Sequence, residues 1–261
     1  MRPVRTRLMT IGGSAALIAA LVATAGAAPA AEQVAPAASI AATDDFYDTP
    51  ATLPDGDGDV IRDEPSTFYL DPAKLIEADA HVRRVMYKST DAHGDPIAVT
   101  GTVLVPEHDW IGDGERPLIG YAAGTQGLGD QCAPSRQLAA GSEYEGAFLE
   151  GLLTRGYAVA LTDYEALGTE GVHTYMARAS QGHAVLDAVR AARNLGLDGV
   201  PADGPVALSG YSQGGGASAA AAELAADYAP DLGVDAAYAG AVPADLPAVG
   251  RNLDGGLYAA F

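Results

Sequence analysis

The fold of this chain is decided by one short stretch, Pro205-Val206-Ala207-Leu208-Ser209-Gly210-Tyr211-Ser212-Gln213-Gly214-Gly215-Gly216. An apolar run enters Gly-x-Ser-x-Gly and an alanine-rich helical run follows at once, which is the strand–turn–helix context of a nucleophile elbow. We expect Gly210 and Gly214 to be required, because a side chain at either position would collide with the neighbouring strand or helix. The turn would lift the Ser212 hydroxyl above the sheet and direct the Gln213 N–H to where an oxyanion forms.

The Gly-x-Ser-x-Gly motif alone is a weak signal, since a chain with 32 glycines produces it by chance. The alternative interpretation is an ordinary glycine-rich turn. The apolar run before the motif and the helical run after it favour a catalytic serine. Ser212 is therefore the predicted nucleophile.

Strands and helices alternate along most of the chain. Strand-like runs occupy 82–90, 97–105, 117–122, 157–162, 206–209 and 234–242, and helical patterns occupy 144–155, 177–195 and 215–227. The first two strand-like runs are joined by Asp91-Ala92-His93-Gly94-Asp95, which predicts a hairpin. The alternation predicts an α/β-hydrolase fold: a mostly parallel sheet flanked by helices, with an antiparallel hairpin at its N-terminal side.

The N-terminus has the pattern of a secretory signal peptide. Three arginines precede an apolar run from Leu8 to Ala25, and Ala25-Gly26-Ala27 and Ala28-Pro29-Ala30 both offer cleavage sites. The alternative is a retained membrane anchor, but the run is short and ends in small residues and proline. We expect residues 1–30 to be a signal peptide, 31–45 a disordered leader and 46–261 the hydrolase domain of a secreted protein without a stable membrane anchor.

The charge of the chain excludes some partners. The net charge is −19, and loss of the signal peptide would remove three arginines and no acids, giving −22. Such a surface disfavours nucleic acid and anionic membranes as partners. The Asp55, Asp57 and Asp59 spacing resembles the start of a calcium loop, but Val60 and Ser66 occupy positions where glycine and glutamate are needed. We expect a solvated turn there, and neither a metal nor a cofactor.

A catalytic triad on this fold places its acid and its histidine after the serine. No histidine follows Ser212. His173, in the loop after 157–162, is expected to be a loop residue, with substrate contact as the alternative; His183 is expected to pack on its helix. Asp245 is the one candidate triad acid after Ser212, and the alternative is that it caps the helix that follows it. Asp163 is expected to fix the loop after its strand by accepting backbone N–H bonds.

A second oxyanion donor is expected from the loop after 117–122. Gly124–Gly127 fits, because glycines allow backbone N–H groups to approach a substrate closely. Thr125 and Gln126 are equally good candidates for the donor. The alternative is an ordinary glycine-rich connection.

Several segments taken together resemble the secretory lipases, the lipase-A-like branch of the α/β-hydrolases. They are Gly58-Asp59-Val60-Ile61-Arg62, Tyr121-Ala122-Ala123-Gly124-Thr125-Gln126-Gly127-Leu128, Cys132-Ala133-Pro134-Ser135, Thr162-Asp163-Tyr164-Glu165-Ala166-Leu167-Gly168-Thr169 and Gly210-Tyr211-Ser212-Gln213-Gly214-Gly215. The resemblance covers about four-fifths of the chain, from Phe46 onward. Ala166 departs from it, because the family carries a glycine at this position.

The resemblance implies an exported carboxylester hydrolase that cleaves acylglycerols or other lipid-like esters through an acyl-serine intermediate. It also implies a further hundred or more residues, holding a helical cap and the triad acid and histidine, so we expect the sequence to be truncated at its C-terminus. In the family the cysteine of the Cys-Ala-Pro-Ser segment pairs with one in the C-terminal part, which would account for the lone Cys132. We expect no reactive role for this thiol.

The leading hypothesis is a secreted serine ester hydrolase acting on small-molecule or lipid esters. One alternative is a serine peptidase of the same fold, because Gly-Tyr-Ser-x-Gly-Gly also suits exopeptidases. A second is a non-catalytic protein that retains only the lipid cleft of a hydrolase, which the missing histidine favours. An assay that distinguishes ester hydrolysis from fatty-acid binding without hydrolysis would separate the hydrolase from the binding protein.

Overall fold

A seven-stranded mixed sheet is the centre of the computed structural model, which describes residues 45–256. The predicted signal peptide, 1–30, and all of the predicted leader except Asp45 lie outside these residues. Within 45–256, no helix has both the length and the apolar character needed to cross a bilayer.

Four strands come first in the chain, two helices follow, and strands and helices alternate from β5 onward. The strands are β1 (Val60–Pro65), β2 (Ala80–Thr90), β3 (Pro96–Pro106), β4 (Leu118–Ala122), β5 (Ala158–Thr162), β6 (Val206–Tyr211) and β7 (Val234–Gly240). The helices are α1 (Pro134–Ala140), α2 (Gly146–Thr154), α3 (Arg178–Asn194), α4 (Gln213–Tyr228) and α5 (Leu246–Leu253), with short 3₁₀ turns η1 (Asp45–Tyr47) and η2 (Asp130–Cys132).

The sheet order is β1-β2-β3-β5-β4-β6-β7. The pairs β5–β4, β4–β6 and β6–β7 are parallel, whereas β1, β2 and β3 extend the sheet with antiparallel pairing. The predicted hairpin is confirmed, since β2 and β3 pair without a break from Ala80 opposite Pro106 to Thr90 opposite Pro96. The parallel strands therefore end together at one edge, where active sites form on open α/β sheets.

Strand β1 was not predicted, because its sequence lies among turn residues and lacks an apolar alternation. It is half-buried and pairs with β2. Two cross-strand ion pairs help to hold it there, Arg83 with Asp63 and Arg84 with Glu64. Backbone pairing with β2 at the sheet edge, with Val60 and Ile61 packed against the core, makes this segment a strand.

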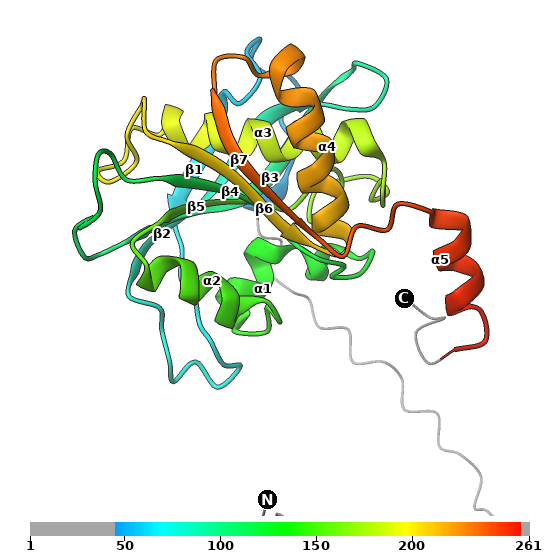
Figure 1. Ribbon diagram of the computed structural model, residues 1–261, viewed down its shortest axis with the longest axis horizontal. Helices are drawn as coiled ribbons and strands as arrows, with labels where there is room; N and C mark the ends of the chain where they lie inside the picture. Colours follow the sequence, from blue (N-terminus) through cyan, green and yellow to red (C-terminus); the bar gives the residue numbers. More distant parts are fainter. Residues whose placement is uncertain (1–44, 257–261) are drawn as a thin grey trace, which may run out of the picture. The chain divides into compact units, whose positions relative to one another are not determined.

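Helices cover both faces of the sheet. Figure 1 shows α3 and α4 over one face and α1 and α2 over the other. On the first face α3 packs on β2, β4 and β5, and α4 packs on β6 and β7; on the second, α1 and α2 pack on β3 and β5. This arrangement confirms the predicted sheet flanked by helices.

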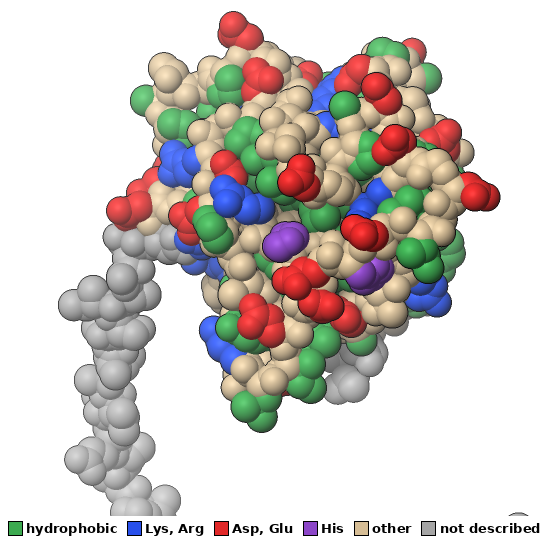
Figure 2. Space-filling view, turned by 90° about the vertical axis from the view of Figure 1, so that its left-hand side faces the viewer, with side chains coloured by type: hydrophobic (Ala, Val, Ile, Leu, Met, Phe, Trp, Pro, Cys, Tyr) green, Lys and Arg blue, Asp and Glu red, His purple; other side chains and the backbone are tan. Residues whose placement is uncertain are grey.

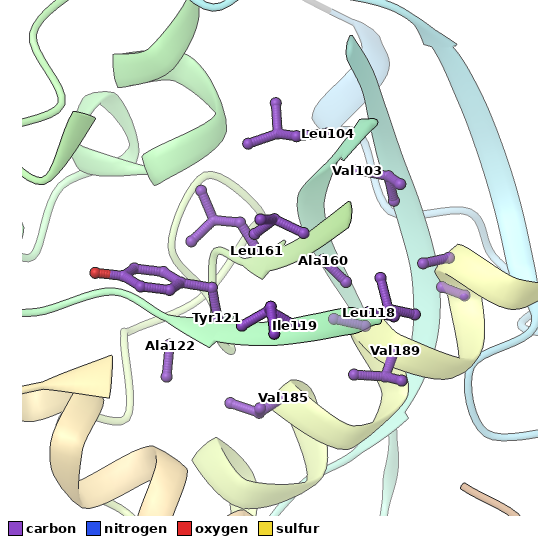
Figure 3. Close-up of a cluster of buried hydrophobic side chains, with 14 of the residues drawn as sticks. Val103, Leu104, Leu118, Ile119, Tyr121, Ala122, Ala160, Leu161, Val185 and Val189 are labelled. Carbon is purple, nitrogen blue, oxygen red and sulfur yellow. The ribbon is translucent and has the colours of Figure 1, made fainter. Parts of the chain in front are cut away.

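The core between β4 and α3 is tightly closed. Val185 and Val189 of α3 lie against β4 (Figure 3), and both are buried. The close packing requires glycine at position 120 of β4, because a Cβ on Gly120 would lie 2.7 Å from a methyl group of Val189. The close approach fixes α3, and with it the loop that precedes α3, relative to the carboxyl end of β4.

Acidic side chains are scattered over the face shown in Figure 2, with fewer basic ones between them, as the net charge of −19 requires. The Asp55–Asp59 segment makes protein contacts: Asp57 forms an ion pair with Lys88 and accepts a 2.9 Å hydrogen bond from Thr90. Asp59 accepts the Gly56 N–H at 3.0 Å. These bonds describe a turn packed on β2.

Candidate active site

Ser212 stands alone between the end of β6 and the first residue of α4. Its φ of 58° and ψ of −119° are strained for a residue with a side chain. The turn is held on both sides, because Ser212 N–H donates to Gly240 O at 2.9 Å and Gly216 N–H donates to Ser212 O at 3.0 Å. This is the backbone geometry predicted for the elbow, and β6 has a strand on either side of it.

The elbow glycines are required by backbone contacts. A Cβ on Gly210 would lie 2.1 Å from Gly214 O, and a Cβ on Gly214 would lie 1.9 Å from Ala122 O. Both predicted collisions are present. A third was not predicted: a Cβ on Gly215 would lie 2.0 Å from Gly240 O. The end of β4, the elbow and the end of β7 therefore meet at backbone contact distance.

A cleft of about 500 Å³ opens beside Ser212. Its lining is mainly apolar and comprises Thr125, Tyr175, Ser212, Pro243, Leu246, Val249, Gly250 and Leu253. Helix α5 supplies half of these residues. The structure thus brings Thr125, from the loop after β4, to the same cleft as Ser212.

The predicted oxyanion donors have free N–H groups. Within residues 45–256, the backbone N–H groups of Gln213, Thr125 and Gln126 have no hydrogen-bond acceptor. Gln213 is the first residue of α4, so its N–H also lies at the positive end of the helix dipole. The Gln126 side chain turns away and donates to Glu143 Oε1 at 2.9 Å.

Two glutamates that sequence reasoning missed hold this loop. Glu145 Oε2 accepts the Gly124 N–H at 2.8 Å, and Glu143 Oε1 accepts the Glu145 N–H at 3.0 Å. Burial raises the pKa of Glu143 to about 7, and burial also raises the pKa of Glu145. No sequence pattern marked them, because their role depends on the loop folding back onto the start of α2.

Asp163 is fully buried at the end of β5. It accepts a 2.7 Å bond from Thr100 Oγ1 and a 2.8 Å bond from the Ser135 N–H at the start of α1. The expectation that it fixes its own following loop is therefore wrong, since the backbone N–H that it binds belongs to α1. Burial raises the pKa of Asp163 to about 6, despite the hydrogen bonds from Ser135 and Thr100.

The loop between β5 and α3 reaches the site through Tyr164. This residue has a φ of 68°, and its hydroxyl donates to Ala123 O at 2.6 Å. Ala166 has a φ of 51°, a left-handed conformation that suits glycine, which explains the glycine expected from the family resemblance.

All five histidines of the sequence lie in the described region, and none hydrogen-bonds the Ser212 hydroxyl there. His173 lies near the elbow, but its Nδ1 is 2.9 Å from Glu165 O and its Nε2 is 3.0 Å from Gln213 Nε2. His183 stacks on Tyr228 at 3.9 Å between ring centroids, as expected for a packed helix residue.

Asp245 caps α5, as the cap interpretation predicted, by accepting the Ala248 N–H at 2.9 Å. Cys132 has a free thiol and lies beside the loop after β4, because a Cβ on Gly127 would lie 2.6 Å from its Sγ.

Comparison with known proteins agrees with this geometry. Residues 133–261 match the family described as "Secretory lipase". The chain is 35% identical over 193 residues to a Mycobacterium tuberculosis protein named "Probable inactive lipase MT1628", covering 71% of this chain and 42% of that protein. It is 30% identical over 232 residues to Lipase A of Arthroderma benhamiae, covering 82% of this chain and 48% of that protein.

Among solved structures, lipase A of Candida antarctica superposes with a TM-score of 0.69 at 26% identity, over 83% of this chain and 49% of that one. The chain thus spans about half the length of the relatives it matches. The structural match confirms the predicted α/β-hydrolase fold. Sheet order, elbow and sequence matches together place the chain in the secretory lipase family.

Proposed function

We propose that this chain carries the nucleophile half of a secreted serine carboxylester hydrolase, with Ser212 as the residue that attacks the ester carbonyl. The N–H of Gln213 and the N–H of Thr125 or Gln126 stabilise the oxyanion of the tetrahedral intermediate. The observation that carries the proposal is the strained elbow of Ser212, which opens into a cleft beside unpaired N–H donors.

The proposed substrate class is a lipid ester, held with its acyl chain along the cleft. Leu246, Val249 and Leu253 of α5 give this cleft an apolar side. Burial of each methylene in such a site contributes about 0.8 kcal/mol to binding, so the affinity for an ester would depend on the length of its acyl chain. The relatives are named as lipases, one of them as a probable inactive lipase, which supports the same substrate class.

The nucleophile also needs a base to take its proton. Among the described residues no histidine is placed to act as this base. None hydrogen-bonds the Ser212 hydroxyl, and both ring nitrogens of His173 are hydrogen-bonded elsewhere. The expected rate for the 261-residue chain is therefore low. A serine hydrolase site without its base keeps roughly 10³–10⁴-fold catalysis over water.

A second candidate is a lipid-binding protein that does not turn over its ligand. The relative named as a probable inactive lipase favours it, as does the lack of a base at Ser212. It would use the same cleft without the elbow chemistry.

The test is hydrolysis of p-nitrophenyl butyrate by the chain and by Ser212→Ala, with and without added imidazole as an external base. The matched control is Ser142→Ala, which removes an exposed hydroxyl outside the cleft. We expect a slow turnover that Ser212→Ala abolishes and Ser142→Ala leaves unchanged. Added imidazole should raise the hydrolysis rate more with the wild-type chain than with Ser212→Ala.

Equal rates in the wild-type chain and Ser212→Ala, with or without imidazole, would refute the hydrolase proposal. Binding of a fluorescent fatty acid under the same conditions would then favour the second candidate. A peptide p-nitroanilide run in parallel tests the peptidase alternative, for which we expect no Ser212-dependent cleavage.

A further inference from the structure

We propose that His173 is a positioning residue of the oxyanion site, which acts by holding Gln213 through its side-chain amide. This inference rests on the proposed function, because it assumes that the Gln213 N–H stabilises the oxyanion. It assigns a buried histidine, which the Ser212 chemistry otherwise leaves unused, to the elbow.

The geometry determines the state of the imidazole. A carbonyl oxygen only accepts, so His173 Nδ1, 2.9 Å from Glu165 O, carries the hydrogen. An amide nitrogen only donates, so Nε2, 3.0 Å from Gln213 Nε2, is the acceptor. His173 is therefore neutral, with its hydrogen on Nδ1.

Burial supports the neutral form. The residues His173 and Gln213 are 5% and 2% exposed, so both are shielded from water. Burial lowers the pKa of His173, and Glu165 partly offsets this effect through its carbonyl and its charge. The other titratable groups against the ring are Tyr164 and Tyr175, whose rings lie 5.9 and 6.3 Å from it.

The bond reaches the reaction through the backbone. Gln213 immediately follows Ser212 and begins α4, and its N–H has no acceptor among residues 45–256. Fixing its side chain restricts the rotation of the first turn of α4 about the strained Ser212. A misplacement of about 1 Å in such a donor can cost on the order of 10²-fold in rate.

The same loop also holds the other half of the proposed oxyanion site. Tyr164 donates to Ala123 O at 2.6 Å, and Tyr175 lies 3.0 Å from Thr125 Oγ1, hydroxyl to hydroxyl. His173 lies between these two tyrosines in the sequence and contacts both rings. The loop after β5 therefore touches both candidate donor segments, with His173 as its contact to the elbow.

The geometry argues against His173 as the general base. Its Nε2 lone pair is taken by Gln213, so it would have to break this bond to accept the Ser212 proton. A positioning residue and a base predict different effects of substitution.

The experiment compares Ser212-dependent ester hydrolysis in His173→Ala, His173→Gln and Gln213→Met. We expect His173→Ala to lower kcat by roughly 10- to 100-fold with KM changed less than about twofold. Gln213→Met, which keeps the backbone N–H but loses the amide, should fall similarly, and the double variant should be no worse, because both changes remove one interaction. His173→Gln should recover part of the rate, because its amide oxygen can accept from Gln213.

The matched control is His183→Ala, since His183 lies on α3, stacks on Tyr228 and has its Nδ1 3.0 Å from Thr90 O. A readout independent of activity is the ¹⁵N spectrum of the imidazoles, which should show His173 neutral with a protonated Nδ1. Gln213→Met should change this His173 signal and leave that of His183 in place.

An unchanged kcat in both His173→Ala and Gln213→Met, while Ser212→Ala loses activity, would overturn the inference and leave the proposed function standing. So would activity in His173→Ala as low as in Ser212→Ala with no recovery in His173→Gln, which is the behaviour of a base. If Ser212→Ala retains full activity, the proposed function fails instead, and a His173 spectrum with a protonated Nε2 would reject the bond by itself.

Discussion

The carboxylate of Glu145 accepts the backbone N–H of Gly124 at 2.8 Å, and this bond ties the loop after β4 to the start of α2. The absence of a side chain on Gly124 leaves room for Tyr144, because a Cβ there would lie 2.1 Å from the hydroxyl oxygen of Tyr144. The loop that carries Thr125 and Gln126 is therefore held by two contacts, the buried Glu145 carboxylate at Gly124 and the Tyr164 hydroxyl at Ala123 O.

Replacement of Glu145 by alanine should lower both stability and Ser212-dependent turnover. It would leave the Gly124 N–H buried without an acceptor, which costs about 1–3 kcal/mol, and would release the loop. Urea unfolding and p-nitrophenyl butyrate hydrolysis measure the two effects. Glu145→Gln, which keeps an acceptor oxygen, should retain most of both, and Glu170→Ala, at an exposed position, should match the wild type. Wild-type stability in Glu145→Ala would show that the bond does not hold the loop.

The pH dependence of stability should contain a contribution from Glu143. Its pKa is raised to about 7 by burial, and its Oε2 has no hydrogen-bond partner in the described region. Because the folded-state pKa lies above the unfolded value, Glu143 favours folding below about pH 4.5, and this contribution is lost as pH rises to about 7. Between pH 5 and pH 8 the loss should be on the order of 2 kcal/mol.

Glu143→Gln, a neutral mimic of the protonated acid, should remove this part of the pH dependence. The measurement is the free energy of unfolding in urea at pH 5 and pH 8 for both proteins. A difference between the two pH values that is the same in Glu143→Gln and in the wild type would contradict the assignment.

Replacement of Ala166 by glycine should stabilise the chain. Ala166 has a φ of 51°, and such a conformation costs a residue with a side chain on the order of 1 kcal/mol. Thermal unfolding of Ala166→Gly should therefore shift to higher temperature. The control is Ala219→Gly inside α4, which should lower stability by about 1 kcal/mol because the backbone there is helical. A lower midpoint for Ala166→Gly would mean that its side chain contributes more by packing than its backbone costs.

Most of the fold could be predicted from local sequence patterns. The β2–β3 hairpin, the buried strands β4 and β5 and the helices α3 and α4 all carry strong periodicity or turn signals, and each lies within a few residues of its expected place. Strand β1 and helix α1 could not be predicted in this way. The first is held by ion pairs with β2, and the second begins at Pro134, where the Asp163 side chain binds the adjacent Ser135 N–H. Both depend on partners distant in sequence.

In the candidate site, too, local features could be predicted from the sequence, and features that depend on distant partners could not. The elbow is a local feature, so Ser212, Gln213 and the two flanking glycines could be placed from the motif together with the apolar run before it and the helical run after it. The roles of Glu143, Glu145 and His173 could not, because each depends on a fold-back that brings it to a backbone or side-chain group more than one element away. Single polar residues of this kind have no periodicity to mark them.

Covalent trapping tests most directly whether Ser212 is the nucleophile. A fluorophosphonate bonds to a reactive serine oxygen with loss of fluoride. Intact-protein mass spectrometry with peptide mapping locates the adduct. We expect one adduct, on Ser212, that forms faster with added imidazole and is absent from Ser212→Ala, while Ser142→Ala labels like the wild type. An adduct on another residue, or equal labelling of the wild type and Ser212→Ala, would contradict this expectation.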